Sequence, residues 1–129
     1  MDKKAKKILV VDDEKDLRGA LRTVLVASKF EVIEATNGVD GLALAESEHP
    51  DLILLDIMMP KMNGHEMLRE LRKHPWGMHM HVLLLTNADD PANIAQGAVL
   101  RSDEYLIKSQ TSLNTIVKKV KQHILGYHN

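Results

Sequence analysis

The sequence predicts an α/β fold built on a parallel sheet, and two features of its hydrophobic pattern carry this prediction. Four short apolar runs, at residues 8–11, 52–55, 82–85 and 105–107, lack the polar alternation of a half-exposed strand. Such runs are typical of strands buried on both faces of a parallel sheet. Segments with helical spacing of apolar residues separate the runs, as in βαβ units. Right-handed crossovers then leave few ways to wind five strands and five helices.

Helical periodicity follows the first run. Apolar side chains from Leu17 to Leu25 recur three and four positions apart, and Ser28 with Lys29 closes this helix. Residues 32–33 then form a short second strand.

The second helix begins after a turn at Asn37 and Gly38. It ends before Pro50, because the residue preceding a proline disfavours the helical conformation. The strand at 52–55 follows, and Pro60 breaks the chain after it.

The remaining helices have recognisable start signals. Asn63, followed three residues later by Glu66, resembles a capping box for a helix that runs through Leu71. Residues 89–91, Asp-Asp-Pro, open a fourth helix, since proline is tolerated in the first turn. A last helix with one apolar face covers residues 113–125.

Composition excludes several classes of function. Seventeen basic and eighteen acidic residues give a net charge of −1, so no overall field favours nucleic acid. The absence of cysteine excludes disulfides and thiolate metal sites. No apolar run is long enough for a signal peptide or for the ~18 residues of a membrane span. We expect a soluble, cytoplasmic chain with no nucleic-acid or membrane partner, divided into a basic lead-in (1–6), one domain (7–126) and a tail (127–129).

Each apolar run ends at residues suited to phosphoryl transfer. Asp12 and Asp13 follow the first run, Asp56 the second, Thr86 the third and Lys108 the fourth. Ligands of open α/β sheets bind at the carboxyl ends of the strands, so these side chains should converge. A carboxylate such as Asp56 can accept a phosphoryl group as an acyl phosphate. Asp12 and Asp13 supply hard oxygen ligands for Mg²⁺, while Lys108 and Thr86 offer a charge and a hydroxyl to phosphoryl oxygens.

Four segments in this order make the chain resemble the receiver domain of two-component response regulators. They are VVDDE at 10–14, LDIMMPKMNG at 55–64, LT at 85–86 and YLIK at 105–108. The resemblance implies a flavodoxin-like (βα)5 three-layer sandwich with strand order 2-1-3-4-5. It also implies a stand-alone phosphoacceptor of a two-component or phosphorelay system, which takes its phosphoryl group from a histidine kinase or histidine phosphotransfer protein. Such a module catalyses only its own phosphorylation and dephosphorylation, and passes the signal to a downstream protein that the sequence does not identify.

The resemblance also assigns roles at the metal site. Asp56 is the phosphoacceptor, Asp13 the principal ligand of Mg²⁺, and Asp12 a ligand directly or through water. The Asp56 carboxylate and the backbone carbonyl of Met58 are the remaining metal ligands that the protein provides.

A switch and a docking surface follow from the same resemblance. On phosphorylation, Thr86 moves toward the phosphoryl group and Tyr105 turns inward. Partner docking uses the face of the first helix opposite its apolar side chains, which we expect to be exposed. This docking stripe consists of Lys15, Arg18, Gly19, Arg22 and Val26.

Two positions depart from the family pattern. Ser109 follows Lys108 where the family usually has a proline after a cis bond, and Arg101-Ser102 stand where Gly-Ala is usual. A cis bond before a residue other than proline costs ~3 kcal/mol. We therefore expect a trans bond after Lys108, a rearranged loop through Thr111, and a cap on the final helix from Thr111 or Ser112.

Particular residues argue against three alternative functions. A phosphatase of the haloacid-dehalogenase type needs a second aspartate two residues after its nucleophile, where this chain has Met58. A flavodoxin-like nucleotide binder would need a glycine-rich loop after the first strand, and none is present. A pseudo-receiver that only binds partners conflicts with the intact set of acids.

A soft-metal site near the start of the third apolar run is a further alternative. His74, His79 and His81 lie close together there, with Met78 and Met80 between them. We expect instead an ordinary loop, over which Trp76 packs.

Overall fold

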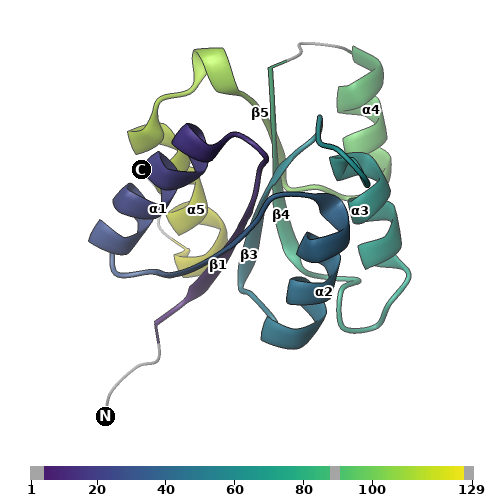
Figure 1. Cartoon of the computed structure of the whole chain (residues 1–129), viewed down its shortest axis with the longest axis horizontal. Coiled ribbons are helices and arrows are strands. Elements are labelled where there is room, and N and C mark those ends of the chain that lie inside the picture. The colour runs from purple at the N-terminus through teal and green to yellow at the C-terminus, as the bar shows by residue number, and fades with distance from the viewer. Residues whose placement is uncertain (1–4, 88–90, 127–129) are drawn as a thin grey trace.

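The computed structural model describes residues 5–87 and 91–126, without the side chains of residues 91–93. Strands and helices alternate along the described chain, as the sequence predicts (Figure 1). In chain order they are β1 (Lys7–Val11), α1 (Lys15–Ala27), β2 (Glu31–Ala35), α2 (Gly38–Glu48), β3 (Leu52–Asp56), α3 (Gly64–Arg72), β4 (His81–Thr86), α4 (Pro91–Val99), β5 (Glu104–Ile107), a short 3-10 helix (Lys108–Gln110) and α5 (Leu113–Leu125).

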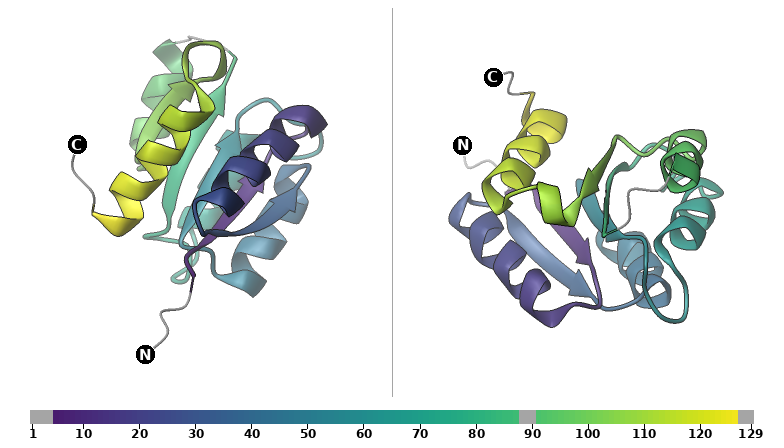
Figure 2. Two further views of the ribbon diagram at one scale, coloured as in Figure 1. Left: turned by 90° about the vertical axis from the view of Figure 1, so that its left-hand side faces the viewer. Right: turned by 90° about the horizontal axis from the view of Figure 1, so that it is seen from above.

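The strands form one parallel sheet in the order β2-β1-β3-β4-β5. Helices α1 and α5 cover one face of the sheet, and α2, α3 and α4 cover the other (Figures 1 and 2). The predicted three-layer flavodoxin-like fold and its strand order are therefore confirmed.

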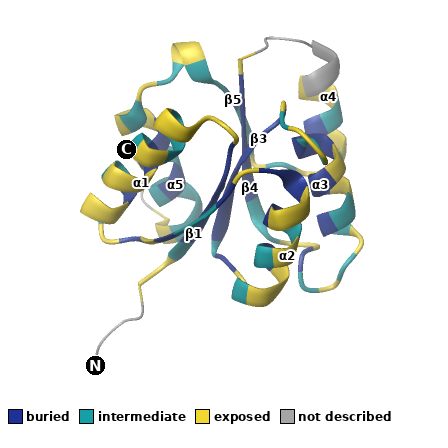
Figure 3. Ribbon diagram, viewed as in Figure 1, coloured by how far each residue is buried: buried dark blue, intermediate teal, exposed yellow. Residues whose placement is uncertain are grey.

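Successive residues of each strand point to opposite faces of the sheet and divide the core into two clusters. In β1, Ile8 and Val10 pack toward α1 and α5, whereas Leu9 and Val11 pack toward α2 and α3. The central strand β3 is buried along its whole length, as Figure 3 shows. Burial on both faces explains why these runs show no polar alternation.

Strand β2 is longer than the predicted residues 32–33, since it extends from Glu31 to Ala35. It lies at the edge of the sheet, where polar side chains are tolerated. Glu34 forms ion pairs with Arg18 (3.0 Å) and Arg22 (2.8 Å) of α1. An edge strand with two glutamates lacks the continuous apolar signal on which the prediction relied.

Helix starts follow the predicted capping signals. The Asn63 side chain accepts from the backbone N–H of Glu66 (2.9 Å), and the Glu66 carboxylate accepts from the N–H of Asn63 (3.1 Å). This reciprocal pair is the predicted capping box. Ser112 caps α5 by accepting from the N–H of Thr115 (3.1 Å), as one of the two predicted caps. The predicted start of the fourth helix at 89–90 lies outside the described residues.

The loop after β5 is rearranged around Ser109. No cis peptide bond occurs in the described ranges, so the bond after Lys108 is trans, as expected. Residues Lys108–Gln110 form a 3-10 turn, and the Thr111 hydroxyl donates to the carbonyl of Ile107 (2.8 Å). The chain thus turns into α5 without the usual proline.

The second departure from the family pattern falls at the end of α4. Arg101 has φ of +61°, in the left-handed region that favours glycine. The N–H of Arg101 donates to Ala98 (3.1 Å) and that of Ser102 to Gly97 (3.0 Å). The chain therefore keeps the turn that a glycine would make, but with a residue for which this conformation is unfavourable.

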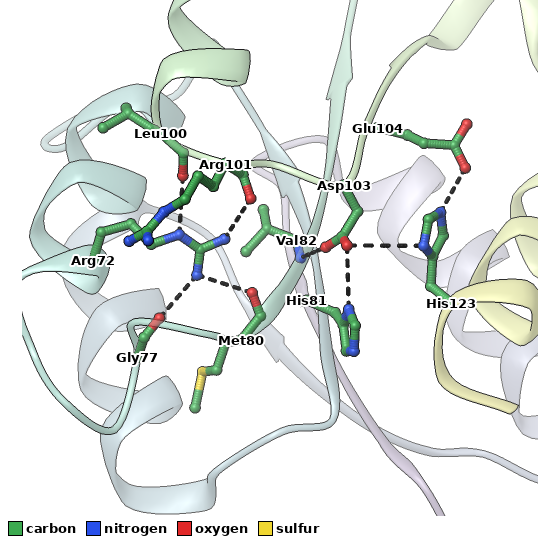
Figure 4. Close-up of polar contacts among 10 residues, drawn as sticks. All are labelled: Arg72, Gly77, Met80, His81, Val82, Leu100, Arg101, Asp103, Glu104 and His123. Atoms are coloured by element: carbon green, nitrogen blue, oxygen red, sulfur yellow. Dashed lines mark hydrogen bonds and ion pairs between the residues drawn. The ribbon is translucent and has the colours of Figure 1, made fainter. Parts of the chain in front are cut away.

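Arg72 holds this turn from α3 (Figure 4). Its guanidinium donates to the carbonyl oxygens of Leu100 (2.9 Å) and Arg101 (2.8 Å) on one side. On the other side it donates to Gly77 (2.8 Å) and Met80 (2.9 Å). One side chain thus ties the ends of α3 and α4 to the loop that leads into β4.

That loop is packed, as the sequence predicts. The ring of His74 stacks on Trp76 at a centroid distance of 4.9 Å, and Trp76 and Met80 pack against the core. His81 Nδ1 lies 3.2 Å from Asp103 Oδ1.

Candidate functional site

The predicted site residues meet at the carboxyl end of the sheet. Asp12 follows β1, Asp56 ends β3, Thr86 ends β4 and Lys108 follows β5. Asp12, Asp56 and Thr86 are buried, with at most 3% of each residue exposed. Because the strand order reverses between β1 and β3, the loops that follow these two strands diverge and leave room for a ligand.

Lys108 is the centre of the charge arrangement. Its ammonium lies 2.9 Å from Asp12 Oδ2, 2.9 Å from Glu14 Oε1 and 3.4 Å from Asp56 Oδ1. Burial disfavours its charged form, but hydrogen bonds to Asp12 and Glu14 and the nearby negative charges outweigh burial and raise the pKa of Lys108. The same hydrogen bond to Lys108 lowers the pKa of Glu14. Lys108 is therefore a fixed cation among three carboxylates.

The surroundings of Asp56 favour its protonated form. Burial, followed by the charge of Asp12, raises the pKa of Asp56 to about 7, against the opposing influence of Lys108. One ammonium thus does not fully compensate the buried acids, and a second cation would favour the ionised form of Asp56.

Three carboxylates fit such a cation. Oxygens of Asp12, Asp13 and Asp56 all lie within 4.8 Å of one another, and Asp13 is exposed to solvent while the other two are buried. Hard carboxylate oxygens are the ligands of Mg²⁺ and Mn²⁺, which also keep open positions for water and phosphate oxygens. The donor set therefore fits the predicted divalent metal.

Backbone contacts fix the two buried acids. The N–H of Glu14 donates to Asp12 Oδ1 (2.8 Å), and that of Met58 approaches Asp56 Oδ1 (3.4 Å). Gly64 starts α3 directly against β3, where its N–H donates to the carbonyl of Ile57 (2.8 Å). A Cβ at Gly64 would fall on the carbonyl oxygen of Asp56, so only glycine lets the helix pack this closely.

The remaining predicted residues have these positions. Thr86 is fully buried at the end of β4, and Tyr105 is half-buried on β5 against the α2–α3 side of the core. Met58 is 66% exposed, in the loop after β3. The role of its backbone carbonyl as a metal ligand stays a prediction.

The docking stripe on α1 is exposed except at one position. Lys15, Gly19, Arg22 and Val26 are exposed. Arg18 is only partly exposed, which corrects the expectation, because its guanidinium pairs with Glu34 (3.0 Å) and donates to the carbonyl of Asp12 (2.9 Å). Arg18 therefore braces the loop that carries the acids.

Glu14 is a site residue that sequence reasoning missed. Besides Lys108, it contacts the amide of Asn87 (Nδ2 to Oε1, 3.5 Å) in the loop after β4. Its place next to Asp12-Asp13 was the available signal, but a glutamate after two aspartates is also ordinary at the start of a helix.

Comparisons with known proteins agree with this geometry. The family model described as "Response regulator receiver domain" matches residues 8–121. The chain belongs to this family. It is 40% identical over 108 residues to the "Probable transcriptional regulator ycf27" of Cyanophora paradoxa, a match that covers 84% of the chain and 44% of that relative. The chain thus spans about half the length of several curated relatives that it matches.

Solved receiver structures share the fold closely. The chemotaxis protein CheY4 of Vibrio cholerae superposes with a TM-score of 0.86 at 27% identity, covering 93% of this chain and 99% of CheY4. The Mn²⁺-bound form of the response regulator Rcp1 superposes with a TM-score of 0.81 at 28% identity, covering 96% and 97% of the two chains. The phosphatase, nucleotide-binding and pseudo-receiver alternatives find no support in these matches. In the part of the chain that the structure describes, no helix is long and apolar enough to cross a membrane.

Proposed function

We propose that Asp56 accepts a phosphoryl group from the phosphohistidine of a histidine kinase or histidine phosphotransfer protein, with Mg²⁺ held in the acidic pocket. The observation that carries this proposal is the position of Lys108, whose ammonium lies 3.4 Å from Asp56 Oδ1 beside an acidic trio that fits a divalent cation. Nucleophile, fixed cation and metal ligands thus meet at one edge of the sheet.

The residues divide the chemistry between them. Asp56 attacks phosphorus while the P–N bond to the donor imidazole breaks, which gives an aspartyl phosphate and a neutral histidine once that ring takes a proton. Lys108 neutralises one phosphoryl oxygen, and the Thr86 hydroxyl donates to another. Asp12, Asp13, Asp56 and the carbonyl of Met58 would hold Mg²⁺, which supplies the second positive charge that brings donor phosphate and carboxylate together.

Signal output follows from movement of two residues on neighbouring strands. We assign the switch to Thr86 and Tyr105, because β4 and β5 pair directly and Thr86 ends β4 beside Asp56. A change at Thr86 can then reach the surface near α4 and β5, where an unidentified target protein would bind.

Donor docking is assigned to the stripe on α1 (Lys15, Arg18, Gly19, Arg22 and Val26), which adjoins the acidic loop. We assign the receiver unit to residues 7–126, supported by β1 starting at Lys7 and Gly126 following α5.

The docking stripe is tested at Arg22. Reversing the charge at Arg22 should slow transfer from the cognate donor but not from a small phosphodonor. Equal slowing of both would refute this docking surface.

The phosphoacceptor role is tested with acetyl phosphate and Mg²⁺. Intact-protein mass spectrometry should show the addition of one phosphoryl group to the parent chain. D56N should show none, while D16N, at an exposed aspartate of α1, should be labelled like the parent. Full labelling of D56N would reject the assignment.

A further inference from the structure

A second polar cluster lies at the opposite end of the sheet from the acidic pocket. His81 is the first residue of β4, Asp103 immediately precedes β5, Glu104 is its first residue, and His123 lies near the end of α5. Figure 4 shows the two imidazoles approaching Asp103 from different sides. The donors come from segments far apart in the chain, so no local sequence motif reveals them.

The two distances from Asp103 to the imidazoles are close to those between ligands of one metal ion. His81 Nδ1 lies 3.2 Å and His123 Nδ1 3.8 Å from the same oxygen, Asp103 Oδ1. Two ligands bound to Zn²⁺ at ~2.0–2.1 Å with tetrahedral angles are separated by ~3.4 Å. Both imidazole nitrogens are therefore near the required distance from the carboxylate oxygen.

Surrounding groups hold the donors as they do in metal sites. The other oxygen of Asp103 accepts from the N–H of Val82 (2.7 Å), which fixes the carboxylate. The far nitrogen of His123, Nε2, lies 2.6 Å from Glu104 Oε2, and Lys119 in turn lies 3.1 Å from Glu104 Oε1. A metal-binding histidine typically has such a carboxylate on its second nitrogen.

We propose that His81, His123 and Asp103 form a Zn²⁺ site, separate from the Mg²⁺ pocket. Two imidazoles and one carboxylate suit zinc better than Mg²⁺, which prefers oxygen ligands. Zn²⁺ takes the place of the Nδ1 proton on each ring, with water as the fourth ligand. It would tie the starts of β4 and β5 to the end of α5.

Binding requires the cluster to close, because among the described residues only the acidic trio already has three donor atoms within 4.8 Å of one another. The two rings are 6.4 Å apart between centroids, and ligation of one ion through both Nδ1 atoms brings them together by about 1 Å. The His81 side chain is 44% exposed and has room to rotate, whereas His123 is held by Glu104. Closure therefore occurs mainly at His81.

The site is tested by calorimetric titration of the full chain with Zn²⁺, at mildly alkaline pH and with millimolar Mg²⁺ present to occupy the acidic pocket. The parent should bind one Zn²⁺, and H81N and H123N should each weaken binding by about tenfold or more. H79N is the matched control, because His79 is exposed in the loop just before β4, and it should bind like the parent.

Two results would overturn the proposal. One is Zn²⁺ affinity that is unchanged in H81N and H123N but lost in D13A, which would place the ion in the acidic pocket. The second result comes from NMR of the parent protein. Zn²⁺ should shift the imidazole signals of His81 and His123 but not that of His79. If the signals of His81 and His123 do not shift, these rings serve only as partners of the carboxylates. Neither result bears on phosphorylation of Asp56.

Discussion

The raised pKa of Asp56 makes the stability of the metal-free protein depend on pH. The pKa of this carboxyl is 3.8 for the free group and about 7 in the fold, because of burial and then the charge of Asp12. Below pH 3.8 the carboxyl is protonated in both the folded and the unfolded protein, so it does not change the free energy of unfolding. As the pH rises toward 7, the unfolded chain loses this proton while the folded chain keeps it, so stability falls, and above 7 the penalty is complete.

The penalty at Asp56 amounts to about 4 kcal/mol, since each tenfold change in proton affinity is worth about 1.4 kcal/mol. D56N removes the charge and should stabilise the metal-free protein by up to about 4 kcal/mol above neutral pH. This gain should shrink through the range between the two pKa values and vanish at the acidic end.

Urea unfolding in the presence of EDTA, over a series of pH values, measures this difference directly. D16N removes an exposed acid outside the pocket; it is the control and should not reproduce the gain in stability of D56N. Added Mg²⁺ should reduce the advantage of D56N, because the metal stabilises only the parent's intact pocket. A D56N advantage that is constant across the whole range would refute the reasoning about burial and Asp12.

Three further predictions concern side chains around the site and the helix ends. K108M should slow labelling by acetyl phosphate by about 100-fold or more, measured by intact mass, because it removes the fixed cation; a rate within a few-fold of the parent would contradict this role. G64A should destabilise the protein by about 1–3 kcal/mol, because the added Cβ clashes with the backbone at the end of β3. At Gly19 of α1 a Cβ meets nothing within 4 Å, so G19A should stabilise the protein by about 0.5–1 kcal/mol. R72A should lower the free energy of unfolding by about 3–4 kcal/mol, because it removes four hydrogen bonds worth about 1 kcal/mol each. The control R69A, at an exposed position of α3, should lower it by less than about 0.5 kcal/mol. Equal urea midpoints for these two variants would argue against the bracing role of Arg72.

The sequence was sufficient for the sheet and most of the pocket because both depend on local patterns. Uninterrupted apolar runs such as 52–55 predict buried parallel strands, and parallel strands bring their carboxyl ends to one edge. Asp12, Asp56 and Lys108 therefore had to converge once the strand order was known. The edge strand β2 was underestimated, because Glu31 and Glu34 interrupt its apolar signal.

Contacts set by side-chain geometry could not be predicted in this way. Glu14 and Lys108 are 94 positions apart and meet only because the loops after β1 and β5 adjoin. The pairing of Arg18 with Glu34 depends on how α1 packs against β2. A helical wheel contains no such information, and it therefore placed Arg18 on the exposed face. His123 carries no signal that links it to Asp103, because that contact requires the packed position of α5.

Chemical trapping tests most directly whether Asp56 forms the acyl phosphate. The chain is treated with acetyl phosphate and Mg²⁺, then reduced with borohydride, which converts an aspartyl phosphate to homoserine. Peptide mass spectrometry should find homoserine at position 56 and unmodified aspartate at positions 12 and 13. Homoserine at either of those positions, or at none of the three after labelling of the intact protein, would contradict the assignment of Asp56 as the phosphoacceptor.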